Sequence, residues 1–82
     1  MVTIMAIKIM PRGKTAPAVQ SILTEYGCII KTRLGIHEAT TGSCSQTGLI
    51  LLQLIGDDKE QINSLHDELN NIDGVVAKVL EL

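Results

Sequence analysis

Hydrophobic and polar positions along the chain alternate between the period of a strand and the period of a helix. Residues 2–9 are almost continuously apolar, which indicates a central strand covered on both faces. Pro11 interrupts this run. A helix is predicted to begin near Thr15 or Ala16, with Pro17 in its first turn, where a missing N–H costs nothing. Its buried side is marked by apolar residues at helical spacing: Val19, Ile22, Leu23 and Tyr26.

The middle of the chain has the pattern of two strands joined by a polar segment. Gly27 is expected to end the first helix. Residues 28–37 alternate between apolar and polar positions. Residues 38–47 are small and polar, which is typical of a long hairpin loop, and residues 48–56 form the most apolar strand. In the strand at 28–37, the set expected to face the core is Ile30, Thr32, Leu34 and Ile36.

The last third of the chain predicts a helix followed by a strand. Two aspartates are suitable N-caps, because each has a glutamate or glutamine three positions later. These two registers are Asp57 with Glu60 and Asp58 with Gln61. A buried stripe follows at Ile62, Leu65, Leu69 and Ile72. Asp73 and Gly74 then turn the chain into a final strand at residues 75–80.

The order of these elements is β-α-β-β-α-β, which is the order of a ferredoxin-like plait. Right-handed crossovers place the first and third strands in the centre of one antiparallel sheet. The predicted fold is therefore an α+β domain over residues 1–82, with strand order 4-1-3-2 and both helices on one face of the sheet.

Two helices cover only one face of a four-stranded sheet, yet the third predicted strand is apolar on both sides. One set of its residues, Ile50, Leu52 and Leu54, would face the helices. The opposite set predicts an interface: Leu49, Leu51, Gln53 and Ile55. An exposed apolar face of this size is unusual for a stable monomer. We therefore expect a homo-oligomer, a dimer or tetramer, formed through the open sheet face or the sheet edges, with a monomer as the alternative.

Composition excludes several functions for this chain. It has 82 residues, is 45% hydrophobic and contains one aromatic residue, Tyr26. Without exposed aromatic residues it has no stacking platform for nucleic acid, so no nucleic-acid binding by the chain itself is expected. No signal peptide or membrane span is recognised, and two cysteines are too few for a disulfide framework. These features predict a cytoplasmic protein with reduced thiols and no membrane association.

Charge divides the chain into a basic and an acidic part. Residues 1–37 carry five basic residues and one acidic residue, whereas residues 38–82 carry two basic and eight acidic residues. Within the basic part, Arg12, Gly13 and Lys14 precede the predicted start of the first helix, where backbone N–H groups and the helix dipole favour an anion. A phosphate-binding P-loop is excluded because Lys8 stands where its first glycine is required. The alternative is a solvated turn with a helix cap.

Metal binding and catalysis find little support in the spacing of the reactive residues. The donor side chains are His37, Glu38, Cys44 and His66, with Cys28 in reserve. No CxxC or HxxxH pair is present, so no metal or cofactor is expected, although His37 and Cys44 could meet across the hairpin. Ser43 and Ser45 lie near both but have no orienting acid or oxyanion hole, so the chain is not expected to be an enzyme.

Two segments resemble a known family. The first is Arg33-Leu34-Gly35-Ile36-His37 followed by Gly48-Leu49-Ile50-Leu51-Leu52-Gln53-Leu54, and the second is Leu69-Asn70-Asn71-Ile72-Asp73-Gly74-Val75-Val76-Ala77-Lys78. They are similar to the small ACT-like iron-only hydrogenase system regulators and to the ligand-binding C-terminal domain of the nickel-responsive regulator. The resemblance implies a ferredoxin-like plait, oligomers built by sheet association, effectors near the loop after the first strand, and a regulatory role.

Together these observations predict a homo-oligomeric ACT-like regulatory module that binds a small anionic ligand or an amino acid and has no catalytic activity. Two other interpretations remain open. One is a structural protein–protein interaction domain without a small-molecule ligand. The other is a sensor of nickel or another transition metal.

Overall fold

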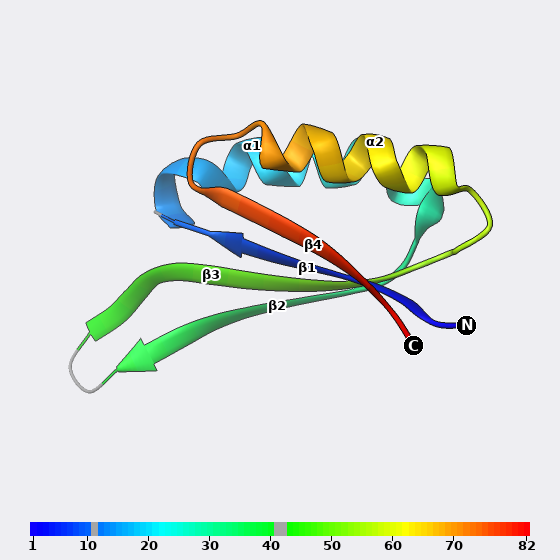
Figure 1. Cartoon of the computed structure of the whole chain (residues 1–82). Helices are drawn as coiled ribbons and strands as arrows, with labels where there is room; N and C mark the ends of the chain where they lie inside the picture. Colours follow the sequence, from blue (N-terminus) through cyan, green and yellow to red (C-terminus); the bar gives the residue numbers. More distant parts are fainter. Residues whose placement is uncertain (11, 41–42) are drawn as a thin grey trace.

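Four strands and two α-helices follow one another in the order β-α-β-β-α-β. Figure 1 presents them in a computed structural model that describes the backbone of residues 1–10, 12–40 and 43–82 and the side chains of residues 1–10, 14–35 and 47–82. In chain order the elements are β1 (Thr3–Ile9), α1 (Arg12–Glu25), the short 3₁₀ helix η1 (Gly27–Ile29), β2 (Ile30–Thr40), β3 (Ser43–Leu54), α2 (Lys59–Asn70) and β4 (Val75–Glu81).

All four strands belong to one antiparallel sheet. The strand order is β2-β3-β1-β4, so the predicted order 4-1-3-2 is confirmed. Both helices lie on one face of this sheet, and none of the described helices covers the opposite face (Figure 1). The ferredoxin-like plait is therefore confirmed. Among the described residues, no helix is long and apolar enough to cross a bilayer.

The core lies between the helices and the face of the sheet that they cover. Alternate residues of the central strands point into it, among them Met5, Ile7 and Leu52. The predicted helical stripes are confirmed. Three of their residues are only partly buried and pack against the margin of the core: Ile22, Tyr26 and Ile72. The fully covered helical residues are Val19, Leu23, Ile62, Leu65 and Leu69. Burial on this one side leaves the other face of the sheet without cover.

Two side-chain contacts position the helices. Asp58 caps α2 by accepting a hydrogen bond from the N–H of Gln61 at 3.1 Å, which selects the second of the two predicted registers. The hydroxyl of Tyr26, just after α1, donates a hydrogen bond to the carboxylate of Glu68 on α2. This bond, with desolvation and the nearby negative charge, raises the pKa of Tyr26 above its ordinary value of 10.0. The contribution of this pair to stability is therefore present below pH 10 and is lost as the pH rises through the raised pKa.

The first helix begins earlier than predicted. It starts at Arg12, so Pro17 occupies its sixth position rather than its first turn. At this position proline has no N–H to bond the carbonyl of Gly13, so α1 lacks one backbone hydrogen bond there. The ring of Pro17 is exposed to solvent. The far end also differs, because Gly27 opens η1 and does not have the positive φ of a helix-terminating glycine.

The hairpin between β2 and β3 is longer than predicted, and the interpretation of residues 38–47 as a loop is wrong. Both strands continue until Thr40 pairs with Ser43, and residues 41–42 lie outside the described backbone. Backbone hydrogen bonds between two strands need no apolar side chains, so a polar composition did not stop the ladder. The paired hairpin extends beyond the ends of β1 and β4 (Figure 1).

The expected inward face of β2 is also wrong for the described residues Thr32 and Leu34. The ladder is irregular between Ile30 and Thr32, where β2 has one residue more than β3. This bulge reverses the alternation, because a shift of one residue moves every following side chain to the other face. Leu34 therefore pairs with Leu51 on the open face and is 53% exposed.

Candidate ligand-binding site

Two loops meet at one end of the sheet because β1 and β4 are antiparallel neighbours. Ile9 at the end of β1 pairs with Val75 at the start of β4, so the β1–α1 loop lies against the α2–β4 loop. The N–H of Met10 donates a hydrogen bond of 2.8 Å to the carbonyl of Gly74. The two loops are thereby held together at the N-terminal end of α1.

Gly74 is the one described residue with a positive φ, at 85°. A Cβ atom built on it would lie 2.0 Å from the carbonyl oxygen of Met10. Both the conformation and the space therefore require glycine, since an L side chain would be strained in φ and would collide with backbone. The predicted turn at Asp73 and Gly74 is confirmed, and both Gly74 and its contact partner Met10 line a pocket.

This pocket has a volume of about 360 Å³ and is lined by both loops and the first turns of α1. The lining residues are Met10, Lys14, Thr15, Ala18, Ile72, Asp73 and Gly74. The side chains of Lys14 and Asp73 are exposed, and neither forms an ion pair within the described part of the chain. Among the described side chains, the pocket therefore presents a cation, Lys14, and an anion, Asp73, that form no ion pair with each other, beside the positive end of a helix dipole.

Of the three predicted ligand-binding residues, Lys14 lines this pocket. Arg12 and Gly13 are the first two residues of α1, with side chains outside the described part, and Lys14 contributes to the lining. Thr15, the next residue, is buried and also lines the pocket, whereas Asp73 was predicted only as part of a turn and not as a neighbour of Lys14. The predicted strand order contained the necessary signal, because adjacency of the first and last strands brings these loops to the same end.

The predicted interface residues divide between the open face and the end of the strand. Leu49, Leu51 and Gln53 are half-buried on the side of β3 opposite the core residues. Ile55 follows β3, is 45% exposed, and donates its N–H to the carbonyl of Ile29 at 2.8 Å. Only the first three therefore lie within the sheet.

The candidate metal ligands are not brought together in the described part of the chain. His66 is half-buried on α2, with Nδ1 3.0 Å from a carboxylate oxygen of Asp67, and Cys28 is exposed in η1. No group of three or more metal-ligating residues is found among the residues with described side chains. His37, Glu38 and Cys44 have side chains outside that part, although the backbone register pairs His37 with Gly48 and Ala39 with Cys44.

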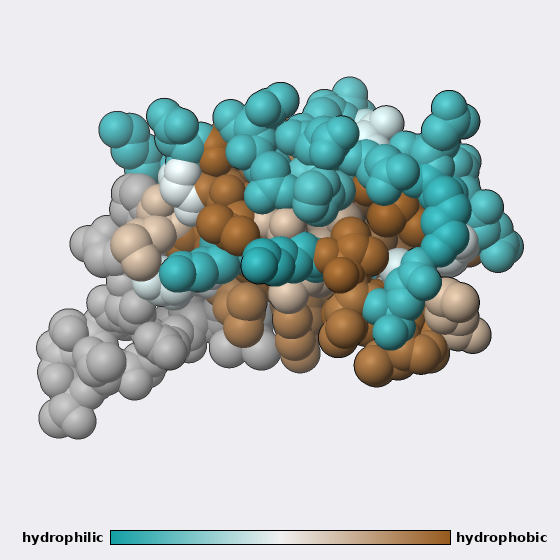
Figure 2. Space-filling model, in the orientation of Figure 1, coloured by the Kyte–Doolittle hydropathy of each residue, from teal (hydrophilic) through white to brown (hydrophobic). Residues whose placement is uncertain are grey.

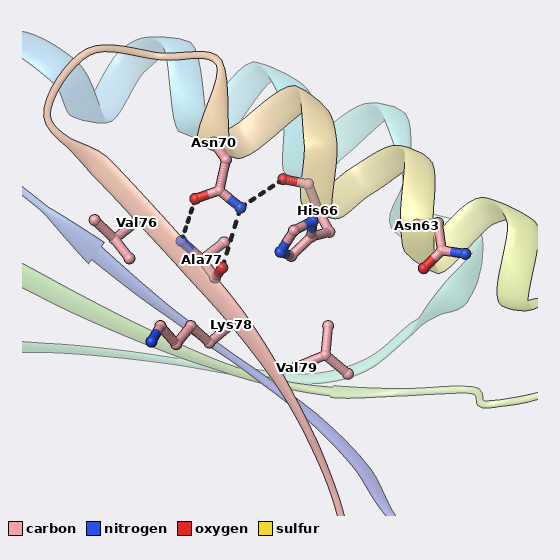
Figure 3. Close-up of a pocket in the computed structure, with 7 residues that line it drawn as sticks. All are labelled: Asn63, His66, Asn70, Val76, Ala77, Lys78 and Val79. Carbon is pink, nitrogen blue, oxygen red and sulfur yellow. Dashed lines mark hydrogen bonds between the residues drawn. The ribbon is translucent and has the colours of Figure 1, made fainter.

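A second, wider depression lies between α2 and β4, and Figure 3 shows that a structural amide occupies its wall. The side chain of Asn70 accepts a hydrogen bond from the N–H of Ala77 at 2.9 Å and donates to the carbonyls of Ala77 and His66 at 3.0 Å. The amide therefore makes the two backbone hydrogen bonds that a neighbouring strand would otherwise make with Ala77. The amide of Asn70 is thus already paired and is not free to bind a ligand.

Replacing Asn70 with aspartate is expected to destabilise the domain by about 1–3 kcal/mol, because a carboxylate would face two carbonyl oxygens that now accept hydrogen bonds. Asn71→Asp is the matched control, since it adds the same charge one residue away at the exposed C-cap. Urea unfolding of both variants measures the difference. Equal midpoints would contradict a structural role for the Asn70 amide.

Comparisons with known proteins identify the fold. No protein-family model matches the chain, and no curated relative is detected. An uncharacterized protein from Thermotoga maritima, TM1266, has a similar structure, with a TM-score of 0.80 and 25% identity over 99% of this chain and 95% of the other.

Two further solved structures share the same architecture at lower identity. The ACT domain of GTP pyrophosphokinase from Chlorobium tepidum has a TM-score of 0.69 and 14% identity, covering 100% of this chain and 88% of the other. A nitrogen regulatory PII-like protein from Thiomonas intermedia, bound to ADP, AMP and bicarbonate, has a TM-score of 0.67 and 11% identity over 99% and 89% of the two chains. The chain therefore has the ACT-like form of the ferredoxin-like fold.

Proposed function

We propose that this chain is a homo-oligomeric, non-catalytic regulatory module that binds a small anionic ligand or an amino acid in the loop pocket. The observation that carries the proposal is that Lys14 and Asp73 both line one pocket of about 360 Å³. Lys14 and the N-terminal end of α1 suit a carboxylate or phosphate, and Asp73 suits an ammonium group. A free amino acid carries both groups.

Regulation would follow from the position of the pocket between two loops. A ligand that contacts Lys14 on one loop and Asp73 on the other would bind more tightly to one spacing of these loops and would shift the population toward it. The ACT domain and the PII-like protein support a regulatory role by likeness of fold, and the PII-like structure holds nucleotides and bicarbonate. Membership of the iron-only hydrogenase regulator family and a cytoplasmic location belong to the same proposal.

The absence of catalysis is proposed from the chemistry of the pocket. The described residues of its lining include one carboxylate, that of Asp73, and neither histidine nor cysteine. General acid–base or nucleophilic catalysis needs a second group within hydrogen-bond reach of the first. The competing proposal is a protein–protein interaction domain without a ligand, which the uncovered sheet face favours.

Thermal unfolding against a panel of the twenty amino acids, ADP, AMP and bicarbonate tests the proposed ligand class. A true ligand at about a hundred times its Kd should stabilise the chain by about 2.7 kcal/mol, which corresponds to roughly 10 °C or more in a domain of this size. Lys14→Ala and Asp73→Asn are expected to reduce this shift. Lys31→Ala, which removes an exposed lysine of β2, should leave it unchanged.

Two results would reject the loop pocket as the binding site. One is the absence of a shift with every compound in the panel, which would favour the interaction-domain alternative. The other is a shift of the same size in the native chain, Lys14→Ala and Asp73→Asn.

A further inference from the structure

The open face of the sheet carries an apolar patch arranged in rows across the strands. Pairing across the sheet gives the row Thr32, Gln53, Ile4 and Leu80, then the row Leu34, Leu51, Ala6 and Lys78. The third row consists of Leu49, Lys8 and Val76. Its fourth position is Ile36, whose side chain lies outside the described part. We call the apolar members the open-face patch: Ile4, Ala6, Leu34, Leu49, Leu51, Val76 and Leu80. No carboxylate lies among these described positions.

This patch is accessible to a partner. Leu34, Val76 and Leu80 are 53%, 49% and 56% exposed, and the other four members are half-buried. Figure 2 shows the contrast between the hydrophilic helices and the hydrophobic side chains that project from the opposite side of the sheet. A contiguous apolar face of this kind marks an interaction surface.

A second chain could also associate by adding a strand to the edge of the sheet. At the outer edge of β4, most of the backbone groups needed for such pairing are already bonded. Asn70 occupies both backbone groups of Ala77, and the N–H of Val75 is bonded to the carbonyl of Ile72. Alternation along an antiparallel strand leaves Val79 and Glu81 as the remaining outward positions. At the second of these positions, the carboxylate of Glu81 forms an ion pair of 2.5 Å with the ammonium group of Lys59.

The outer edge of β2 also has features that discourage strand addition. Lys31 and Arg33 are exposed on it, and its ladder is irregular at two places, between Ile30 and Thr32 and between His37 and Ala39. Charged side chains and bulges on an edge strand oppose pairing with a second chain. Of these surfaces, the open face therefore remains the one whose described residues a partner could cover.

One two-fold arrangement makes this face complementary to itself. A two-fold axis parallel to the strands and midway between β1 and β3 places β3 of one subunit over β1 of the other, with rows matched. Leu51, a large residue, then lies over Ala6, a small one, and this contact occurs twice. Lys78 lies over Leu34 at an edge strand, and Lys8 lies over Leu49 one residue before the end of β1. The stem of each lysine would cover a leucine while its ammonium group extends past the contact to solvent. A two-fold axis perpendicular to the strands at the level of this row would instead place Lys78 over its own copy, which repels.

We propose that a second copy of this chain stacks on the open-face patch, with Leu51 of each subunit packed on Ala6 of the other. The inference rests on the self-association in the proposed function and specifies its surface. Four strands about 4.8 Å apart and seven residues at about 3.3 Å each give a face of roughly 440 Å². Two such faces, with the relief of their side chains, approach the roughly 1,000 Å² of a specific interface.

Sedimentation equilibrium at micromolar concentration, with exchanged residue sizes, tests this contact. The native chain of 8.8 kDa is expected to sediment at twice that mass. Ala6→Leu should raise the dimer Kd at least about tenfold, because it overfills the contact with Leu51. Ala6→Leu combined with Leu51→Ala should restore the native Kd, since the large and small residues have changed places. Circular dichroism checks that each variant is folded.

The control variant Val79→Pro removes an N–H from the free stretch of the β4 edge and should leave the dimer intact. A native monomer would overturn both the self-association and this surface. A native dimer that survives Ala6→Leu, or that the double variant does not restore, would overturn the surface alone. Dissociation by Val79→Pro with retention in Ala6→Leu would assign the interface to the sheet edge.

Discussion

Gly74→Ala is expected to lower the free energy of unfolding by at least about 3 kcal/mol, which is a large fraction of the stability of a small domain. The added methyl group would lie 2.0 Å from the carbonyl oxygen of Met10, at a φ of 85°. Relief of this collision requires the two loops to separate, which breaks the hydrogen bond from Met10 to Gly74. Thermal and urea unfolding both measure the loss.

Gly35→Ala is the matched control for this prediction. A Cβ atom at Gly35 meets nothing within 4 Å, and its φ is not positive. The substitution should therefore be neutral or stabilise the chain by up to about 1 kcal/mol, through reduced freedom of the unfolded state. Similar losses in the two variants would show that the loop contact contributes little.

The same glycine illustrates how far the sequence could predict the site. An aspartate and a glycine after a helical stripe predicted a turn, and the structure confirms it. The partner of Gly74 is Met10, sixty-four positions earlier in the chain, and this contact depends on strand order. Because the loops meet only once β1 and β4 are paired, local pattern alone did not place Asp73 beside Lys14.

The fold was largely predictable because its hydrophobic periods are strong and consistent with its caps. The helical stripe from Ile62 to Leu69 is buried, and Asp58 caps the helix in one of the two expected registers. The errors occur where backbone geometry outweighs side-chain pattern. A single extra residue near Lys31 exchanged the two faces of β2, and the polar hairpin stayed paired because ladder hydrogen bonds do not depend on side chains.

Adjacent leucines on opposite faces of β3 are expected to separate folding from association. Leu52 is 1% exposed and packs in the core, whereas Leu51 is half-buried on the open face. Leu52→Ala should cost about 3 kcal/mol, within the range for a leucine truncated in a core. At concentrations below the dimer Kd, where the chain is a monomer, this loss of unfolding free energy should not depend on protein concentration. Urea unfolding over a hundredfold range of concentration provides the measurement.

Leu51→Ala removes the same atoms from the same strand, so β-propensity and chain entropy change equally in the two variants. At low concentration it should cost well under half as much as Leu52→Ala, because solvent already reaches Leu51 in the single chain. At high concentration the native chain gains stability from association, and Leu51→Ala should lose most of that gain. If the two variants behave alike at every concentration, Leu51 belongs to the core and the open face is not the surface that holds the subunits together.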